Sequence, residues 1–183
     1  MQLFLFALSY ACRTAVAVTF IISALWKIAH PAEFSDAARG ILPPQLSLLR
    51  HRRGAWVISS AEILIGILLL TFNSADVYHY LAIVAALCFL SLFTLALARA
   101  PDLSGGCGCW SSTADHQPRG VYLSRNLVLA ILLLAGSKTG TMSPALMFLA
   151  ICWGSVVSLT LMHLPEIRMV WLAGARHIKA GVT

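Results

Sequence analysis

The chain has few charged residues. Only 11% of its 183 residues are Asp, Glu, Lys or Arg, whereas 59% are hydrophobic, and the mean hydropathy is +0.83. An ordinary soluble domain has about 25% charged and about 45–50% apolar residues. The composition therefore excludes a soluble domain and indicates an integral membrane protein. Four or five membrane-crossing helices of about 20 residues each would use most of the length and leave no room for a large soluble domain.

The chain also lacks the dense cysteine spacing of a disulfide scaffold. Of its five cysteines, only Cys107 and Cys109 are close in sequence. The other three, Cys12, Cys88 and Cys152, lie in apolar runs, where free cysteine behaves as a small hydrophobic residue. We expect these three to pack within the bundle. Internal repeats and low-complexity tracts are absent as well.

Five apolar stretches are long enough to cross a membrane, and each is bounded by Pro, Gly, Asn or charge. The first lacks the basic start of a cleaved signal and is interpreted as a retained helix. Backbone groups in lipid must be hydrogen-bonded internally, and no alternating barrel pattern occurs, so we predict an all-α polytopic membrane helix bundle. The predicted spans are Leu3–Ala29, Gly54–Phe72, Val77–Ala98, Val121–Ser137 and Pro144–Leu164.

Basic residues are unevenly distributed between the loops. They lie beside apolar runs, where Lys and Arg set orientation, so the net charge of +6 does not predict a nucleic-acid partner. One side has little beyond Lys138. The positive-inside rule predicts a cell (inner) membrane protein with the Cys-x-Cys loop and the C-terminal tail in the cytoplasm. The basic residues on that side are Arg39, Arg50, Arg52, Arg53, Arg99, Arg119, Arg168, Arg176 and Lys179.

Two charged residues lie inside the predicted spans. Glu62 is near the middle of the second span, where an ionised carboxylate costs several kcal/mol unless it is paired, hydrogen-bonded or protonated. Antiparallel packing would bring Arg13, in the first span, within about 5 Å of the depth of Glu62. We therefore predict a structural ion pair between Arg13 and Glu62. A role of Glu62 as a proton acceptor or a contact for a polar ligand remains open.

Other polar residues lie close to the cysteine loop. Lys27 follows Trp26 near the end of the first span, and an interfacial Trp beside a snorkelling Lys is the ordinary explanation. Arg125 and Asn126 open the fourth span at a similar level. A neighbouring cation lowers the pKa of a thiol and raises its thiolate fraction. Lys27, Glu62, Arg125 and Asn126 are therefore candidate supporting residues.

The loop sequence GGCGC carries Cys107 and Cys109 between glycines. Glycine permits the tight backbone that a short bridge between them would need. Such a ring is strained, and strained, exposed disulfides are easily reduced, which favours transfer chemistry. Cys107 and Cys109 are therefore candidate catalytic residues for thiol–disulfide exchange, with an inert or structural pair as the alternative.

A metal site is a weaker interpretation of the same loop. A closed zinc site needs four ligands, and the Cys-x-Cys spacing is tighter than the usual one. Besides the two cysteines, the loop offers His116, and the neighbouring loop offers His30 or His51. We expect no metal and no other cofactor.

Four sequence stretches occur in a recognisable order: FIISALWKIAHPAEFSDAARGILPP, SAEILIGILLL, GGCGCW and LSRNLVLAILLL. Together they resemble the MauE family of methylamine utilisation proteins, which is related to the DoxX-like four-helix membrane proteins. The resemblance covers about Phe20 to Leu134 and includes Glu62 and Gly66 as a Glu-x-x-x-Gly motif. It implies a DoxX-like four-helix core at 1–137, with the Cys-x-Cys loop at 103–120. Residues 138–183 would add a fifth transmembrane helix and a basic tail.

The resemblance also implies a function. It suggests that the chain assists maturation, processing or export of methylamine dehydrogenase, whose small subunit is periplasmic, disulfide-rich and bears a quinone made from its own tryptophans. The implied partners are that small subunit, a thioredoxin-like thiol–disulfide protein and the lipid bilayer. Thiol–disulfide exchange through the loop cysteines is the leading hypothesis. The alternative is a non-redox membrane scaffold or chaperone for a secreted partner.

Overall fold

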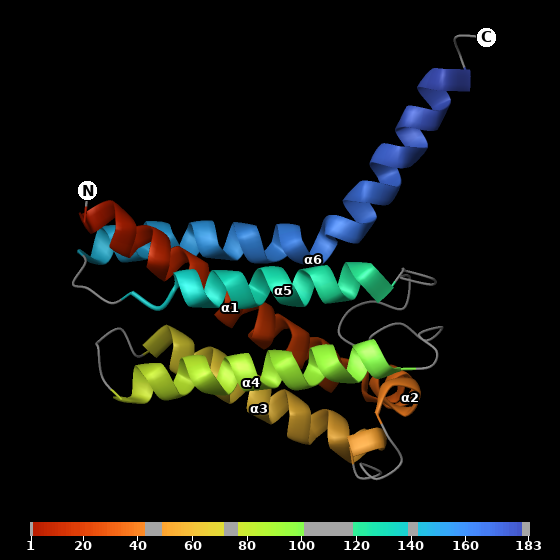
Figure 1. The fold of residues 1–183 in the computed structure, drawn as a ribbon, viewed down its shortest axis with the longest axis horizontal. Helices are drawn as coiled ribbons and strands as arrows, with labels where there is room; N and C mark the ends of the chain where they lie inside the picture. The colour runs from red at the N-terminus through yellow and green to blue at the C-terminus, as the bar shows by residue number, and fades with distance from the viewer. Residues whose placement is uncertain (1, 43–48, 72–76, 101–118, 139–142, 181–183) are drawn as a thin grey trace.

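A computed structural model describes residues 2–42, 49–71, 77–100, 119–138 and 143–180. Over these ranges the protein is built from helices, with no strand, which confirms the predicted all-α bundle (Figure 1). The helices are α1 (Gln2–Ala29), α2 (Pro31–Ile41), α3 (Arg52–Thr71), α4 (Val77–Arg99), α5 (Arg119–Ala135) and α6 (Pro144–Ala180).

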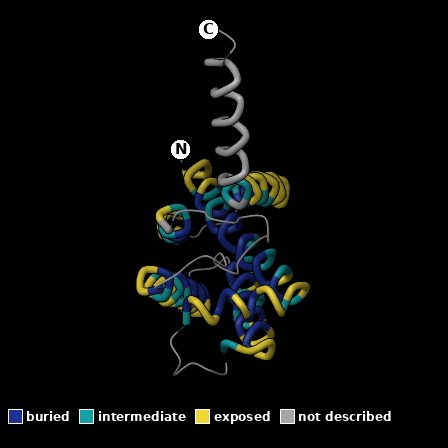
Figure 2. Tube along the Cα trace, turned by 90° about the vertical axis from the view of Figure 1, so that its right-hand side faces the viewer, coloured by how far each residue is buried: buried dark blue, intermediate teal, exposed yellow. Residues whose placement is uncertain are grey.

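The helices have the lengths and composition of membrane spans. Four apolar segments are long enough to cross a bilayer: α1, α3, α4 and Pro144–Leu161 of α6. The fifth, α5, has 17 residues, which is at the short end of the range for a transmembrane helix. Many large apolar side chains point outward, where lipid would cover them, and Figure 2 shows exposed residues on the outer sides of the bundle. The chain is a multi-pass membrane protein.

Helix α1 occupies the centre of the bundle. In Figure 1 it crosses obliquely between α5 and α6 on one side and α3 and α4 on the other. It packs against α3, α5 and α6, and its middle part is almost entirely buried. The successive long helices run in alternating directions (Figure 1). The C-terminal ends of α1 and α4 therefore lie at the same end of the bundle as the N-terminal ends of α3 and α5.

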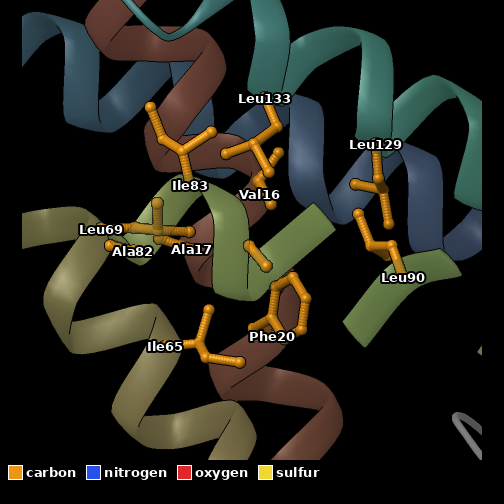
Figure 3. Packing of buried hydrophobic residues seen from close by; sticks show 11 residues of the cluster. Val16, Ala17, Phe20, Ile65, Leu69, Ala82, Ile83, Leu90, Leu129 and Leu133 are labelled. Atoms are coloured by element: carbon orange, nitrogen blue, oxygen red, sulfur yellow. The ribbon is translucent and has the colours of Figure 1, made fainter. Parts of the chain in front are cut away.

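An apolar core fills the space around the middle of α1. Figure 3 shows side chains from α1, α3, α4 and α5 converging there. Phe20 of α1 packs edge to face against Phe89 of α4, with ring centroids 5.5 Å apart. The cluster consists of Val16, Ala17, Phe20, Ile65, Leu69, Ala82, Ile83, Ala86, Leu90, Leu129 and Leu133.

Close packing of α6 on α1 depends on Gly154. A Cβ at Gly154 would lie 2.6 Å from the carbonyl oxygen of Ala11 and 2.8 Å from the Cβ of Thr14. Small residues at such contacts let membrane helices approach closely. We expect Gly154→Ala to push α6 away from α1 and lower the free energy of unfolding by about 1 to 2 kcal/mol. Equilibrium unfolding in mixed micelles of dodecyl maltoside and SDS would measure this change.

Gly120 provides the matched control for that substitution. It also lies in a helix, and among the described residues no heavy atom would come within 4 Å of its added Cβ. Alanine favours helix over glycine by up to about 1 kcal/mol. Gly120→Ala should therefore leave stability unchanged or raise it. Equal losses in the two variants would contradict a specific contact at Gly154.

Two elements differ from the sequence prediction. Helix α2 forms where a loop was expected: Pro31 stands in its first turn with Glu33, and Arg39 stands in its last turn, as in a well-formed helix. Its apolar face packs on α3, and Figure 1 views it nearly end-on, so it lies across the bundle. Helix α6 continues to Ala180, beyond the predicted end of the fifth span.

Candidate functional site

A buried ion pair joins α1 to α3. The Nζ atom of Lys27 lies 2.7 Å from each carboxylate oxygen of Glu62, and it donates a further hydrogen bond of 2.7 Å to Ser23 Oγ, one turn earlier on α1. Lys27 is fully buried and Glu62 is 4% exposed. Three close acceptors match the three hydrogens of the ammonium group, which offsets the cost of removing both charges from water.

Aromatic rings and α2 close this site at one end. The Nζ atom of Lys27 lies 6.0 Å from the ring centroid of Phe34 on α2 and 5.8 Å from that of Phe93 on α4. Both distances are within the range of cation–π attraction. Ser35 holds α2 in place by donating a 2.9 Å hydrogen bond to the carbonyl oxygen of Arg50. Helix α2 thus covers the end of α1 and keeps Lys27 away from solvent.

The ion pair borders a small, partly open cavity of about 40 Å³ between α1, α3, α4 and α5, and most of its lining is apolar. Its apolar lining includes Phe20, Leu90 and Leu129, and Figure 3 shows the last two pointing toward one another. The amide of Asn126 donates a 3.1 Å hydrogen bond to Thr94 Oγ1, which fixes α5 against α4. The polar residues that line the cavity are Thr19, Ser23, Glu62, Arg125 and Asn126.

The structure therefore brings together the four supporting residues that the sequence singles out, since Lys27 binds Glu62 at the cavity wall. The predicted catalytic residues, Cys107 and Cys109, lie outside the described residues. The segment that carries them connects the end of α4 to the start of α5. Thr94 lies in the last two turns of α4 and Asn126 lies about two turns into α5, so the cavity is close to both ends of that segment.

The predicted ion pair between Arg13 and Glu62 is wrong, because Glu62 binds Lys27. Arg13 precedes Lys27 by 14 residues on α1, which is about 21 Å along the helix axis. The prediction assumed that antiparallel packing of the two spans brings Arg13 to nearly the depth of Glu62. The interpretation of Lys27 as a snorkelling interfacial residue is also wrong, because Lys27 is fully buried and α2 covers the end of α1.

Comparison with known families agrees with the resemblance noted in the sequence. The family model described as methylamine utilisation protein MauE matches residues 5–139. The chain belongs to the MauE family. The match covers α1 to α5 and therefore includes every residue that lines this cavity and both loop cysteines. Membership implies involvement in methylamine utilisation. Neither the curated proteins nor the solved structures include one with significant similarity to this MauE-family chain.

A second buried polar cluster lies at the other end of this MauE-family bundle. Arg13 is 1% exposed, and its Nη1 lies 3.0 Å from Nδ1 of the fully buried His79. A guanidinium group only donates, so Nδ1 accepts and His79 is neutral with its hydrogen on Nε2. That hydrogen is directed at the carbonyl oxygen of Ser137, 3.3 Å away. The Tyr10 ring centroid lies 4.8 Å from Arg13 Cζ.

His79 is not among the candidate residues that the sequence singles out. It is the third residue of α4, and a histidine at that position is ordinarily interfacial. The available signal was Arg13 itself, since a charged residue inside a span requires polar contacts. The apolar core of Figure 3 separates this cluster from the Lys27–Glu62 site. Within the described residues, a buried polar site thus lies near each end of the bundle.

The remaining candidate ligands do not form a metal centre in the part of the chain that the structure describes. Within it, no group of three or more His, Cys, Asp or Glu residues is placed to hold a metal ion. Cys107, Cys109 and His116 fall outside that part. The expected packing of three cysteines within the bundle is wrong for Cys88 and Cys152, which are free and exposed on its outer surface, whereas Cys12 is free and half-buried.

Proposed function

We propose that this MauE-family protein assists maturation, processing or export of methylamine dehydrogenase through thiol–disulfide exchange at Cys107 and Cys109. One observation carries the proposal: the buried polar site lies at the end of the bundle where α4 and α5 bracket the cysteine segment. Arg125 and Asn126 lie about two turns into α5, the helix that follows that segment. Their positive and polar groups are the kind of surroundings that favour a thiolate.

The proposed exchange uses the two cysteines in turn. A thiolate of the dehydrogenase small subunit attacks one sulfur of a Cys107–Cys109 disulfide, forms a mixed disulfide and releases the other cysteine as a thiolate. A second thiolate of the small subunit then attacks the small-subunit sulfur of the mixed disulfide and releases the remaining loop cysteine as a thiolate. The small subunit gains one disulfide, and the two cysteines are left reduced. A thioredoxin-like partner in its disulfide form then reoxidises them. A loop thiolate attacks the partner's disulfide, the second loop thiolate resolves the mixed disulfide, and the partner is left reduced.

The distribution of charge supports an inner-membrane orientation with this end facing the cytoplasm. The helix termini and the connection at the cysteine end carry Arg39, Arg50, Arg52, Arg53 and Arg99. The opposite end carries Lys138. By the positive-inside rule, Cys107 and Cys109 would lie on the cytoplasmic side, so the small subunit would react with them there before its export to the periplasm, and the thioredoxin-like partner would act there too. Labelling both cysteines with a membrane-impermeant thiol reagent in intact cells and in inverted vesicles tests this orientation.

The double substitution Cys107→Ser and Cys109→Ser tests the chemical proposal. In cells that produce both proteins, we expect it to abolish formation of quinone-bearing methylamine dehydrogenase, because serine does not take part in disulfide exchange. The amount of quinone cofactor and the disulfide content of the small subunit are the measurements. Cys88→Ser is the control, since Cys88 is free and lies on the outer surface of α4.

The redox state of the cysteines gives a second measurement. Thiol trapping in cells that make the dehydrogenase should show Cys107 and Cys109 in both reduced and disulfide forms. Full maturation with the double-serine variant would rule out the exchange mechanism and favour the non-redox scaffold or chaperone.

A further inference from the structure

An apolar groove runs beside the contact between α1 and α6. Its lining comes from the N-terminal half of α1, the first half of the membrane-crossing part of α6, and Leu132 of α5, and it is almost entirely apolar. The groove is partly open and has a volume of about 480 Å³. Figure 1 shows the N-terminal part of α1 alongside the first part of α6, and the two helices are in contact.

Small residues form the floor of the groove, and large residues form its rims. Ala15 and Ala150 line it and are buried, whereas Phe4, Leu149 and Trp153 line it and are more than half exposed. The surface of the bundle is therefore hollowed here. Because the hydrocarbon region of a bilayer contains no water, an open apolar hollow at this depth is filled by a hydrocarbon chain.

The groove has about the length of one lipid leaflet. It extends along residues 3–15 of α1 and residues 146–157 of α6, which is about 16 to 18 Å along the helix axes. Half of the hydrocarbon core of a bilayer is about 15 Å thick. Just beyond the inner end of the groove, a 2.9 Å hydrogen bond between Thr19 and Ser158 joins the two helices. The groove thus starts near the membrane boundary and ends near the middle of the bilayer.

A lysine lies beside the outer part of the groove. Lys138 follows the end of α5, and its carbonyl oxygen accepts a 2.9 Å hydrogen bond from Ser9 Oγ on α1. The neighbouring residue Leu8 lines the groove. The side chain of Lys138 is exposed, and a lysine side chain reaches from a helix end to the membrane surface. Its charge is complementary to that of an anionic lipid headgroup.

We propose that this groove holds one acyl chain of an anionic phospholipid whose headgroup contacts Lys138. The lipid belongs to the leaflet at the Lys138 end of the bundle. The cysteine segment and the Lys27–Glu62 pair lie at the opposite end, so the proposal does not depend on thiol–disulfide exchange.

Quenching of tryptophan fluorescence by brominated phospholipid tests the proposal. Trp153 borders the groove and is 60% exposed, so bromine atoms on a chain in the groove would quench it. The full chain would keep Trp153 as its only tryptophan, with the other four replaced by Phe. It would be reconstituted into phosphatidylcholine bilayers that contain increasing fractions of phosphatidylglycerol with brominated acyl chains.

Val84→Trp, in a chain without other tryptophans, is the matched reporter. Val84 is 55% exposed, is the eighth residue of α4 from the same end of the bundle, and does not line the groove. A tryptophan there reports lipid that contacts the outer surface without a groove. We expect half-maximal quenching of Trp153 at a phosphatidylglycerol fraction about threefold to fivefold lower than for Val84→Trp.

Two substitutions test the two parts of the site. Lys138→Gln removes the charge and should bring the half-maximal fraction for Trp153 to that of Val84→Trp. Arg53→Gln is its control, because it removes an exposed arginine at the start of α3, at the opposite end, and should change nothing. Ala7→Phe fills the groove from α1 and should also abolish the difference between the two reporters.

Equal half-maximal fractions for Trp153 and Val84→Trp in otherwise unsubstituted chains would overturn the proposal. An unchanged difference in Lys138→Gln would also overturn it. If brominated phosphatidylglycerol and brominated phosphatidylcholine both fail to quench Trp153, a second copy or a partner helix covers the groove, and the lipid proposal is wrong. If Ala7→Phe does not fold, the comparison of the two reporters decides.

Discussion

Glu62→Gln is expected to lower the free energy of unfolding by about 3 to 5 kcal/mol. The substitution keeps the size of the side chain but leaves the ammonium group of Lys27, which is fully buried, opposite a neutral amide. Breaking one side of a buried ion pair is far more costly than losing an exposed one, because the remaining charge stays out of water. Equilibrium unfolding in mixed micelles of dodecyl maltoside and SDS measures the loss.

The double substitution Lys27→Met and Glu62→Met identifies the cause of that loss. Replacing both partners of a buried pair with apolar residues of similar size is often neutral or stabilising. We therefore expect the double variant to be more stable than Glu62→Gln. Glu33→Gln, on the exposed face of α2, is the control and should change stability by less than about 0.5 kcal/mol. If the double variant loses as much stability as Lys27→Met and Glu62→Met do in sum, the two side chains do not interact.

The sequence predicts the helices well, because membrane spans are marked by long apolar runs. The structure has helices at all five predicted positions, with ends that differ by a few residues apart from the extension of α6. Helix α2 starts at Pro31 and contains charged residues, so it lacks the long apolar run by which the other helices were predicted. Its spacing of Phe34, Ala38 and Ile41 is that of a helix face and could have indicated it.

The sequence also identifies which residues form the buried polar site, but not how they pair. Lys27, Glu62, Arg125 and Asn126 stand out because polar groups inside apolar runs are costly unless they have partners. The sequence gives the position of each residue along its own helix, but not the axial offset between helices. The two candidate partners of Glu62 on α1, Arg13 and Lys27, lie about 21 Å apart along the helix axis, and the axial offset between α1 and α3 decides between them. The oblique crossing of α1 and its cover by α2 set this offset, and both result from packing of the whole chain (Figure 1).

His79→Leu is expected to destabilise the opposite end of the bundle by about 2 to 3 kcal/mol. The substitution removes the side chain that accepts a hydrogen bond from the buried Arg13 and is directed at the carbonyl oxygen of Ser137. Leucine fills a similar volume, so the loss comes from the polar contacts. His79→Gln is the matched variant, because the glutamine amide both accepts and donates hydrogen bonds. The loss of stability in His79→Gln should be less than half of the loss in His79→Leu. Equal losses with leucine and glutamine would mean that His79 contributes by packing alone.

Combining His79→Leu with Glu62→Gln tests whether the two polar sites act independently. Arg13 and Lys27, which anchor the two sites on α1, are about 21 Å apart along the helix, and the apolar core separates them (Figure 3). Distant substitutions with no shared partner usually add within about 0.5 kcal/mol. We therefore expect an additive loss in the same unfolding assay. A loss smaller than the sum by 1 kcal/mol or more would show that α1 transmits a shift from one end of the bundle to the other, so that changes near the cysteine segment reach the opposite face of the membrane.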